Sequence, residues 1–451
     1  MGRFATLGEI MRRFFRPLFV LFFLTSVSAI AQWGNISSKT LPNGLKVIFC
    51  EKPGSGFVHT EVWYKVGSKD ETDGIRGMAH LFEHMMFRGT AKYPGNSYFR
   101  LLDSAGAASL NAYTTFDRTV YHSTVPSPAL ELVFDLESDR MKNFIVTQEI
   151  LNTEREVVGE EFRNGENNWY QKLHYNRYPY LYPKGHPYAV DVIGFLPEIL
   201  SFRAEQCVDF FKKHYHPGNA FVVVTGDVKP EIVFSLAEKY FGTLTAVEIP
   251  KTSLATPPLT LNPAEKTDFG IGFPVQIYSL IIPRPAVNHP DFFTFNFLVQ
   301  YLFTNENGIL NERLVKKEKS AFAIQSMSED YSLFPNLGII DIIMEAGPGN
   351  VRVKKAIKEE LQKIAEEGIS QKDFDLFVEN MERNRTFSLF SLSDLASELG
   401  MMEFYFGDFE KVKNPYAQYR KITAEDIRRV SKNWLGEDKF WYLNCKPEWN
   451  E

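Results

Sequence analysis

Two histidines and a glutamate lie at metal-binding spacing in the segment HLFEHMMFRGT, residues 80–90. His80 and His84 are four positions apart, so on a helix their imidazoles share one face and can converge on a single ion. Glu83 lies about 100° around the helix from His84, where its carboxylate can reach a water on that ion without binding the ion. The spacing predicts a zinc site with Glu83 as the catalytic base. Two histidines satisfied within an ordinary core are the alternative.

A catalytic zinc site needs a third protein ligand, and the segment TEREVVGEEF, residues 153–162, offers carboxylates on a second expected helix. Glu154 and Glu161 are seven positions apart and therefore share a helix face, whereas Glu160 lies off that line and is expected to be solvated. We expect Glu161 to be the third ligand. Glu154 is assigned a catalytic role in orienting a histidine, with an ordinary surface carboxylate as the alternative.

Four segments together resemble the inverted-motif zinc peptidases of the insulinase and pitrilysin family. The resemblance is to the shorter, two-domain group that includes the subunits of the mitochondrial processing peptidase. The matching segments are HLFEHMMFRGT (80–90), EREVVGEE (154–161), NAYTTFDRTVY (111–121) and YHPGNAFVVVTGD (215–227). They cover the first half of the chain closely, whereas the second half matches only in pattern.

This resemblance implies the family's fold, its zinc dependence and its endopeptidase activity. Zinc held by His80, His84 and Glu161 would acidify a water and polarise the scissile carbonyl. Glu83 would take the proton from that water and pass it to the leaving amine.

The segment NAYTT resembles the family's edge strand, on which an extended peptide adds by main-chain hydrogen bonds. Asn111 and Ala112 are therefore candidate substrate contacts. Tyr113 and Thr114 are ordinary strand residues in the alternative interpretation. Binding of this kind selects unfolded or short peptides over folded proteins.

An internal repeat indicates how these residues are positioned. Residues 202–227 match residues 422–446 in pattern, with an Ala-Glu near a helix start, an amphipathic helix, a turn and an apolar strand. The strand-like segments 57–67 and 273–283 match at an offset of 216. We therefore expect an α+β protein of two homologous domains, each a mixed or antiparallel sheet with helices packed on it.

The expected domain limits follow from a proline-rich segment between the two copies. Residues 246–266 contain four prolines and no helical period, as is typical of a linker. The catalytic, zinc-binding domain is then 36–245, and the second domain is 267–451.

The second copy lacks the residues that would make it a metal site. At the same offset, Asn296, Val299 and Gln300 replace His80, Glu83 and His84. The family commonly places an Arg and a Tyr, seven apart, in this half to reach the substrate carbonyl and the oxyanion, and the alignment puts Val315 and Phe322 there. Neither side chain donates a hydrogen bond.

We therefore expect a related second subunit to supply the Arg and Tyr in a heterodimer, or a second copy of this chain in a homodimer. A misaligned loop is the alternative explanation of the apolar pair. A rival function is that of a non-catalytic assembly or binding subunit that retains the fold. A third is a protease that processes one specific precursor rather than loose peptides.

The N-terminal residues 1–31 have the basic, apolar and small-residue order of a secretory signal, with cleavage expected after Ala31. A membrane anchor is the alternative, but the apolar run is shorter than the roughly 20 residues that a span needs. We expect an exported protein, in the bacterial periplasm, with no stable membrane anchor after cleavage.

The charge balance and the cysteine content of the mature chain give two further expectations. Removal of residues 1–31 leaves 46 basic and 55 acidic residues, a balance that does not indicate a nucleic-acid-binding protein. Cys50, Cys207 and Cys445 are far apart and odd in number, so they are expected to be buried thiols or to form at most one disulfide.

Overall fold

The computed structural model describes residues 34–247, 256–257, 259, 265–271, 275–304, 308–327, 330–347, 349–436 and 439–447. The expected signal segment 1–31 and most of the expected linker 246–266 lie outside these residues. Among the helices of the described part, none has the length and apolar character needed to cross a membrane.

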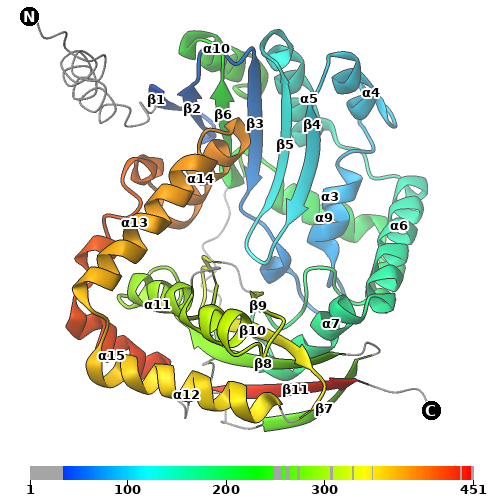
Figure 1. Ribbon diagram of the computed structural model, residues 1–451. Helices are drawn as coiled ribbons and strands as arrows, with labels where there is room; N and C mark the ends of the chain where they lie inside the picture. The colour runs from blue at the N-terminus through cyan, green and yellow to red at the C-terminus, as the bar shows by residue number, and fades with distance from the viewer. Residues whose placement is uncertain are drawn as a thin grey trace, which may run out of the picture.

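The described chain forms two mixed β-sheets, one above the other in Figure 1, and helices pack on both. The first sheet has the order β1-β2-β6-β3-β5-β4 and the second the order β7-β11-β8-β10-β9. Each has one parallel pairing, β2 with β6 and β7 with β11, and its other pairings are antiparallel. The expected α+β class with mixed sheets is confirmed. The strands are β1 (Ile36–Thr40), β2 (Lys46–Glu51), β3 (Phe57–Tyr64), β4 (Ser109–Thr114), β5 (Thr119–Pro126), β6 (Ala220–Gly226), β7 (Glu265–Ile271), β8 (Val275–Arg284), β9 (Ala323–Ser326), β10 (Asn336–Glu345) and β11 (Trp441–Pro447).

The internal repeat expected from the sequence is confirmed by the order of these strands. Helix α9 (Ala204–His214) leads into β6, and α15 (Ala424–Trp434) leads into β11, each at the same place in its sheet. Strands β3 and β8 are likewise equivalent, because each pairs with the strand after that helix and with a following antiparallel strand. In the described residues, β1 is the strand without a counterpart in the second sheet.

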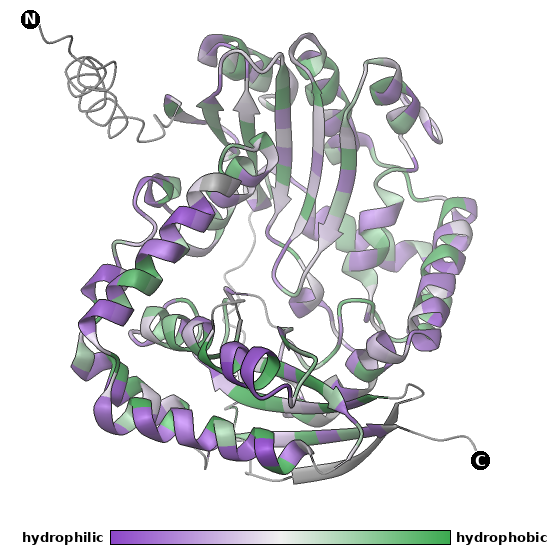
Figure 2. Ribbon diagram, viewed as in Figure 1, coloured by the Kyte–Doolittle hydropathy of each residue, from purple (hydrophilic) through white to green (hydrophobic). Residues whose placement is uncertain are grey.

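Each half covers one face of its own sheet with its own helices. In the first half α3 (Met78–Met85), α5 (Leu130–Asn143), α9 and α10 (Pro230–Phe241) contribute to one hydrophobic core with the sheet. In the second half α11 (Phe292–Val299), α12 (Gly349–Glu367) and α15 do the same. The buried residues of α12 recur every three or four positions, so one face packs and the other meets solvent, and Figure 2 shows this as alternating colours. The remaining helices are α4 (Ser97–Ser104), α6 (Gln148–Asn167), α7 (Trp169–Leu181), α8 (Leu196–Ser201), α13 (Gln371–Ser388) and α14 (Leu392–Phe406).

The opposite face of each sheet is covered by a helix from the other half. Helix α14 packs Leu395 and Leu399 against Trp63 and Phe221 of the first sheet. Helix α7 packs Leu173 and Leu181 against apolar residues of β8, β10 and β11 in the second sheet. Gly400 permits the first contact, because a Cβ there would lie 2.2 Å from the Trp63 ring. This exchange buries both faces of the central strands, which accounts for the uninterrupted apolar run of β6.

The three cysteines are free and buried, as expected for structural thiols. Burial raises the pKa of Cys50 to about 11 and the pKa values of Cys207 and Cys445 to about 12.

Candidate active site

Helix α3 carries the histidines and begins at a glycine. Gly77 has φ 95°, a left-handed conformation, and a Cβ there would lie 2.6 Å from the Ile193 carbonyl oxygen. The helix start has no side-chain cap of its own, but the buried Glu71 carboxylate accepts hydrogen bonds of 2.8 Å from the main-chain N–H groups of Gly77 and Ala79. The first turn of α3 is therefore fixed from the preceding loop.

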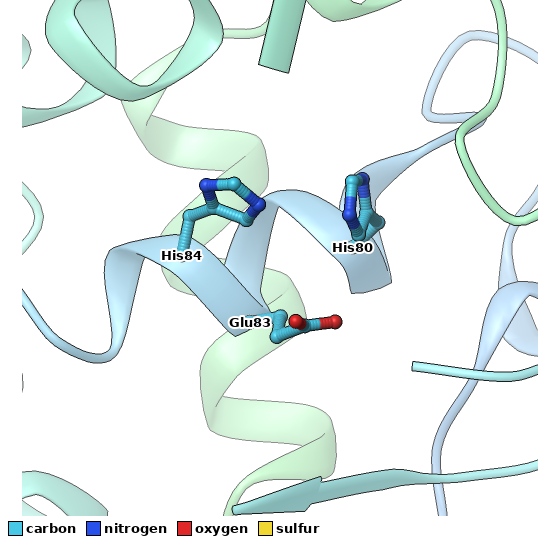
Figure 3. Close-up of side chains that lie close together, drawn as sticks. All are labelled: His80, Glu83 and His84. Atoms are coloured by element: carbon cyan, nitrogen blue, oxygen red, sulfur yellow. The ribbon is translucent and has the colours of Figure 1, made fainter. Parts of the chain in front are cut away.

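The apolar residues of α3 place its polar residues on the open side of the helix. Leu81, Phe82 and Met85 are buried in the first core. The imidazoles of His80 and His84 project from one side of α3 with ring centroids 5.0 Å apart, and the Glu83 carboxylate projects beside them (Figure 3). Ligand atoms of the three side chains all lie within 4.8 Å of one another.

Helix α6 supplies two carboxylates to the same place. Its N-terminus is capped by Thr147, whose hydroxyl accepts a hydrogen bond from the Ile150 N–H. Glu161 Oε2 lies 3.7 Å from His80 Nε2 and 3.5 Å from His84 Nε2. Seven residues earlier, Glu154 is fully buried with Oε2 3.9 Å from His84 Nδ1. The structure thus brings His80, Glu83, His84 and Glu161 together and places Glu154 behind His84.

The geometry of these donors fits a zinc ion. Bonds of about 2.0–2.1 Å in a tetrahedral site put neighbouring ligand atoms about 3.3 Å apart, close to both of the Glu161–histidine distances. Two imidazole nitrogens and one carboxylate are also a donor set that catalytic zinc uses, with a fourth position left open.

Burial and neighbouring charges set the protonation of the site. Burial lowers the pKa of His80 to about 4. Burial also raises the pKa of Glu83, although hydrogen bonds from Thr114 act in the opposite direction and lower it. Burial opposes the charge on His84, but the nearby carboxylates of Glu161, Glu83 and Glu154 outweigh it and raise its pKa. The hydrogen bond from His84 in turn lowers the pKa of Glu161. Each of these two side chains thus favours the charged form of the other, and a metal bound here would compete with protons for both of them.

Two contacts in the site were not predicted from the sequence. The Thr114 hydroxyl donates to Glu83 Oε2 at 2.7 Å, which orients the expected base. Arg88 Nε lies 2.6 Å from Glu154 Oε1 and neutralises that buried carboxylate. In an extended strand Thr114 shares a face with Ala112, but this alternation does not show that Glu83 lies opposite Thr114. The position of Arg88 in the sequence does not indicate that its partner is Glu154.

Asn111 and Ala112 lie on β4, an edge strand of the first sheet. The Thr115 N–H donates to the Arg118 carbonyl at 2.8 Å and closes a two-residue turn to β5. Because bonded and non-bonded pairs alternate along an antiparallel ladder, the main-chain groups of Asn111 and Tyr113 face β5. The main-chain groups of Ala112, a residue that is 7% exposed, point away from β5, and the exposed Asn111 offers its side chain.

The second half presents no counterpart of the histidine pair on its equivalent helix. Asn296 and Val299 lie in α11, with Gln300 directly after it. The Asn296 amide accepts a hydrogen bond from Arg284 and takes part in the second half's own packing. Val315 is partly buried against the second core, whereas Phe322 is 62% exposed.

Two mixed sheets related by an internal repeat, with an HxxEH helix in the first half, are features of an inverted-motif zinc peptidase. Comparison with family models agrees. Residues 46–186 match the insulinase model, peptidase family M16, and residues 201–381 match the model of the M16 inactive domain. The chain belongs to the M16 insulinase family of zinc proteases.

Relatives in this family match over almost the whole length. The zinc protease PqqE of Helicobacter pylori is 27% identical over 426 residues, which are 91% of this chain and 92% of that protein. An uncharacterized zinc protease of Streptomyces coelicolor is 24% identical and covers 89% of this chain and 88% of its own length.

Solved structures share the fold. A protease from Helicobacter pylori superposes with a TM-score of 0.82 at 24% identity, over 92% of this chain and 100% of that one. The periplasmic protease PqqL of Escherichia coli gives 0.75 at 21% identity, over 93% of this chain and 48% of that one. A chain of complex III2 from Candida albicans gives 0.73 at 12% identity, over 91% of this chain and 96% of that one.

Proposed function

We propose that this protein is an exported zinc-dependent endopeptidase that cleaves extended or unfolded peptides. His80, His84 and Glu161 hold the zinc, Glu83 is the catalytic base and Glu154 orients His84. The observation that carries the proposal is the approach of one Glu161 oxygen to the Nε2 atoms of both histidines, at 3.7 and 3.5 Å.

Zinc bound at this site supplies Lewis acidity toward a water and the scissile carbonyl. The chain's own residues do the rest. Glu83, oriented by the Thr114 hydroxyl, takes a proton from the attacking water and delivers it to the leaving amine nitrogen. Glu154, held by Arg88, keeps the His84 ring directed with Nε2 toward Glu161.

The open edge of β4 is the proposed substrate site. A peptide added there as a further strand would pair with the main-chain groups of Ala112, and Asn111 would contact it through its side chain. Thr114, at the end of the same strand, touches Glu83, so a peptide bound along β4 passes the base. Main-chain pairing requires an extended substrate, which favours unfolded or short peptides.

The apolar side chains of Val315 and Phe322 support a second subunit. They offer no hydrogen bond to a developing oxyanion, a contact worth several kcal/mol, about 3, in comparable sites. We propose that a related subunit in a heterodimer supplies an Arg and a Tyr, with a homodimer as the simpler variant. The same observation favours the second candidate function, a non-catalytic assembly or binding subunit.

Export rests on the signal-like residues 1–31. The printed name of the Escherichia coli structural relative, a periplasmic protease, supports the periplasm as the compartment. Cell fractionation with mass measurement of the recovered chain tests this, because a mature mass starting after Ala31 is expected in the periplasmic fraction. Recovery of the uncleaved chain from the cytoplasm would contradict it.

The central test is zinc content and cleavage of a quenched extended peptide by the purified chain 32–451. We expect one zinc per chain, and Glu83→Gln is expected to keep the zinc while kcat falls at least about a hundredfold. Glu161→Gln should lose zinc, whereas Glu160→Gln, its exposed neighbour on α6, should keep it.

The result also decides between the candidate functions. Full activity of the chain alone removes the need for a second subunit. If the chain binds zinc but cleaves the peptide only after a related subunit is added, the heterodimer is supported. If the chain binds zinc but cleaves the peptide under neither condition, the non-catalytic role is favoured.

A further inference from the structure

The turn between β4 and β5 contains a carboxylate in an unusual environment. Phe116 and Asp117 are the two residues of this turn, and turn residues are ordinarily solvated. Asp117 is instead only 2% exposed. A buried carboxylate needs several hydrogen-bond donors, so its partners show what the turn is attached to.

Three donors reach the Asp117 carboxylate from outside the first sheet. The Tyr188 hydroxyl donates to Oδ1 at 2.8 Å. The Leu333 N–H donates to Oδ2 at 3.1 Å, and the Tyr405 hydroxyl donates to Oδ2 at 3.2 Å. Leu333 and Tyr405 belong to the second half, and Tyr188 packs in the core of the second sheet. Burial holds the pKa of Tyr188 far above its usual range, so its hydroxyl stays a donor.

Arg118 extends the same connection along the hairpin. It donates to the Tyr405 hydroxyl at 2.8 Å, and its guanidinium lies 5.6 Å from the Tyr113 ring and 5.5 Å from the Trp63 ring. Tyr113 is a residue of β4 itself. The second half therefore contacts the turn directly, and it is linked to the strand that leads into the turn through Arg118.

Besides Tyr188, the first half contacts the main chain of the turn. The Ser68 and Lys69 N–H groups donate to the carbonyls of Thr115 and Phe116 at 3.2 and 3.0 Å. The Lys69 ammonium donates to the Asp117 carbonyl at 2.8 Å. The Asp117 side chain is the part of the turn that the second half fixes.

We propose that Asp117 is a positioning residue through which the second, metal-free half holds edge strand β4 in place for the incoming peptide. The role rests on the proposed peptidase function, because β4 is the strand on which that substrate is expected to pair. As an edge strand, β4 has a partner strand on one side only, so its place depends on β5 and on the turn. The second half thus serves the reaction by ordering the docking strand.

The test compares Asp117→Asn and Tyr188→Phe with Tyr182→Phe in the zinc-loaded chain 32–451. Tyr182 is a matched control, because it is likewise a buried tyrosine of the first half, and its hydroxyl donates to Asn336 of the second half and not to the hairpin. The readouts are hydrogen exchange over residues 109–115, and KM and kcat for a quenched extended peptide. Tyr188→Phe removes a single hydroxyl and serves if Asp117→Asn does not fold.

Loss of the Asp117 contacts should speed exchange in 109–115 about tenfold and raise KM about fivefold, with kcat within about twofold of the wild type, because one such hydrogen bond accounts for changes of this size. Zinc content should be unchanged. Unchanged exchange and KM would overturn the proposal, and so would equal effects in Tyr182→Phe, which would indicate general loosening between the halves. Inactivity of the wild-type chain both alone and with a related subunit would instead contradict the peptidase function, while exchange would still decide the role of Asp117.

Discussion

Among single residues, Arg88 holds the site's most buried charge. The Glu154 side chain has no exposed surface, and the Arg88 guanidinium and the His84 imidazole lie against it in the described structure. In Arg88→Gln the carboxylate loses its cation, and its hold on the His84 ring weakens. We expect zinc affinity to fall by about tenfold or more, as for other groups that orient metal ligands, measured by competition with a chromophoric chelator.

The control for Arg88 is Arg163→Gln on α6. Arg163 pairs with the exposed Glu160 and contacts neither histidine in the described structure, so its loss should leave zinc affinity unchanged. Equal affinities of Arg88→Gln and the wild type would show that Glu154 orients His84 without help from Arg88.

Thr114 gives a second prediction at this scale. Thr114→Val keeps the shape of the side chain but removes the hydroxyl that donates to Glu83. We expect kcat to fall about tenfold through misorientation of the base, with zinc content unchanged. Thr153→Val, at an exposed position of α6, should leave kcat unchanged. A loss of zinc in Thr114→Val would place the hydroxyl's role in the metal site instead.

Arg88 and Thr114 are the residues of the site whose contacts could not be predicted from the sequence. His80, Glu83 and His84 could be predicted because one helical turn fixes their relation, and Glu154 and Glu161 share a face for the same reason. The contact between Thr114 and Glu83 joins segments 31 positions apart. Such a contact depends on how β4 packs on α3, which no local period encodes.

Among the elements, the packing of α14 on the first sheet depends on Gly400. Alanine in place of a helix-interior glycine ordinarily stabilises a helix by about 0.5–1 kcal/mol. At Gly400 the new Cβ would lie 2.2 Å from the ring of Trp63, which is fully buried and donates to Glu61. We expect Gly400→Ala to lower the free energy of unfolding by about 1–3 kcal/mol, measured by urea denaturation.

Gly159→Ala on α6 is the matched control, because the nearest atoms to its new Cβ lie at an ordinary 3.5 Å. It should be neutral or stabilising. If both alanine variants stabilise the protein, α14 has room to move and the close approach at Trp63 is not what fixes it.

The elements of the repeat were predictable in type and order, but the packing partners of the helices were not. The repeat correctly paired β3 with β8, and the helix and strand α9–β6 with α15–β11. Neither α7 nor α14 was predicted, and even a clear apolar face would not show which sheet a helix packs on. Each helix packs on the sheet of the other half.

At the scale of the whole molecule, α7 of the first half packs on the second sheet, and this packing buries a network of charged groups between the halves. Arg177 of α7 and Asp341 of β10 form a fully buried ion pair, with Nη1 3.0 Å from Oδ1. The hydroxyls of Ser279 and Tyr170 also donate to Asp341. Removing one member of such a pair leaves an uncompensated charge, so the network ties the halves together without adding much net stability.

His174 makes this junction sensitive to acid. Arg177 Nη2 lies 2.8 Å from His174 Nδ1, and because the guanidinium can only donate, the imidazole must accept and stay neutral. Burial, together with the charge of Arg177, lowers the pKa of His174 to about 4. In the unfolded chain its pKa is about 6.5, so below that value the unfolded state binds a proton that the folded state does not. The stability contributed by neutral His174 is therefore complete above pH 6.5 and is lost as the pH falls toward 4.

His174→Gln should remove this part of the acid sensitivity. Between pH 7.5 and 4.5 the loss of unfolding free energy should be smaller in the variant than in the wild type by about 2 kcal/mol. The measurement is urea denaturation of the metal-free protein with chelator present, so that His80 and His84 titrate alike in both chains. The comparison at pH 7.5 is the internal control, because the histidine is neutral there in both the folded and the unfolded chain. If the two chains lose the same free energy on acidification, His174 takes up its proton in the folded state, and the junction must then accommodate two adjacent cations beside Asp341.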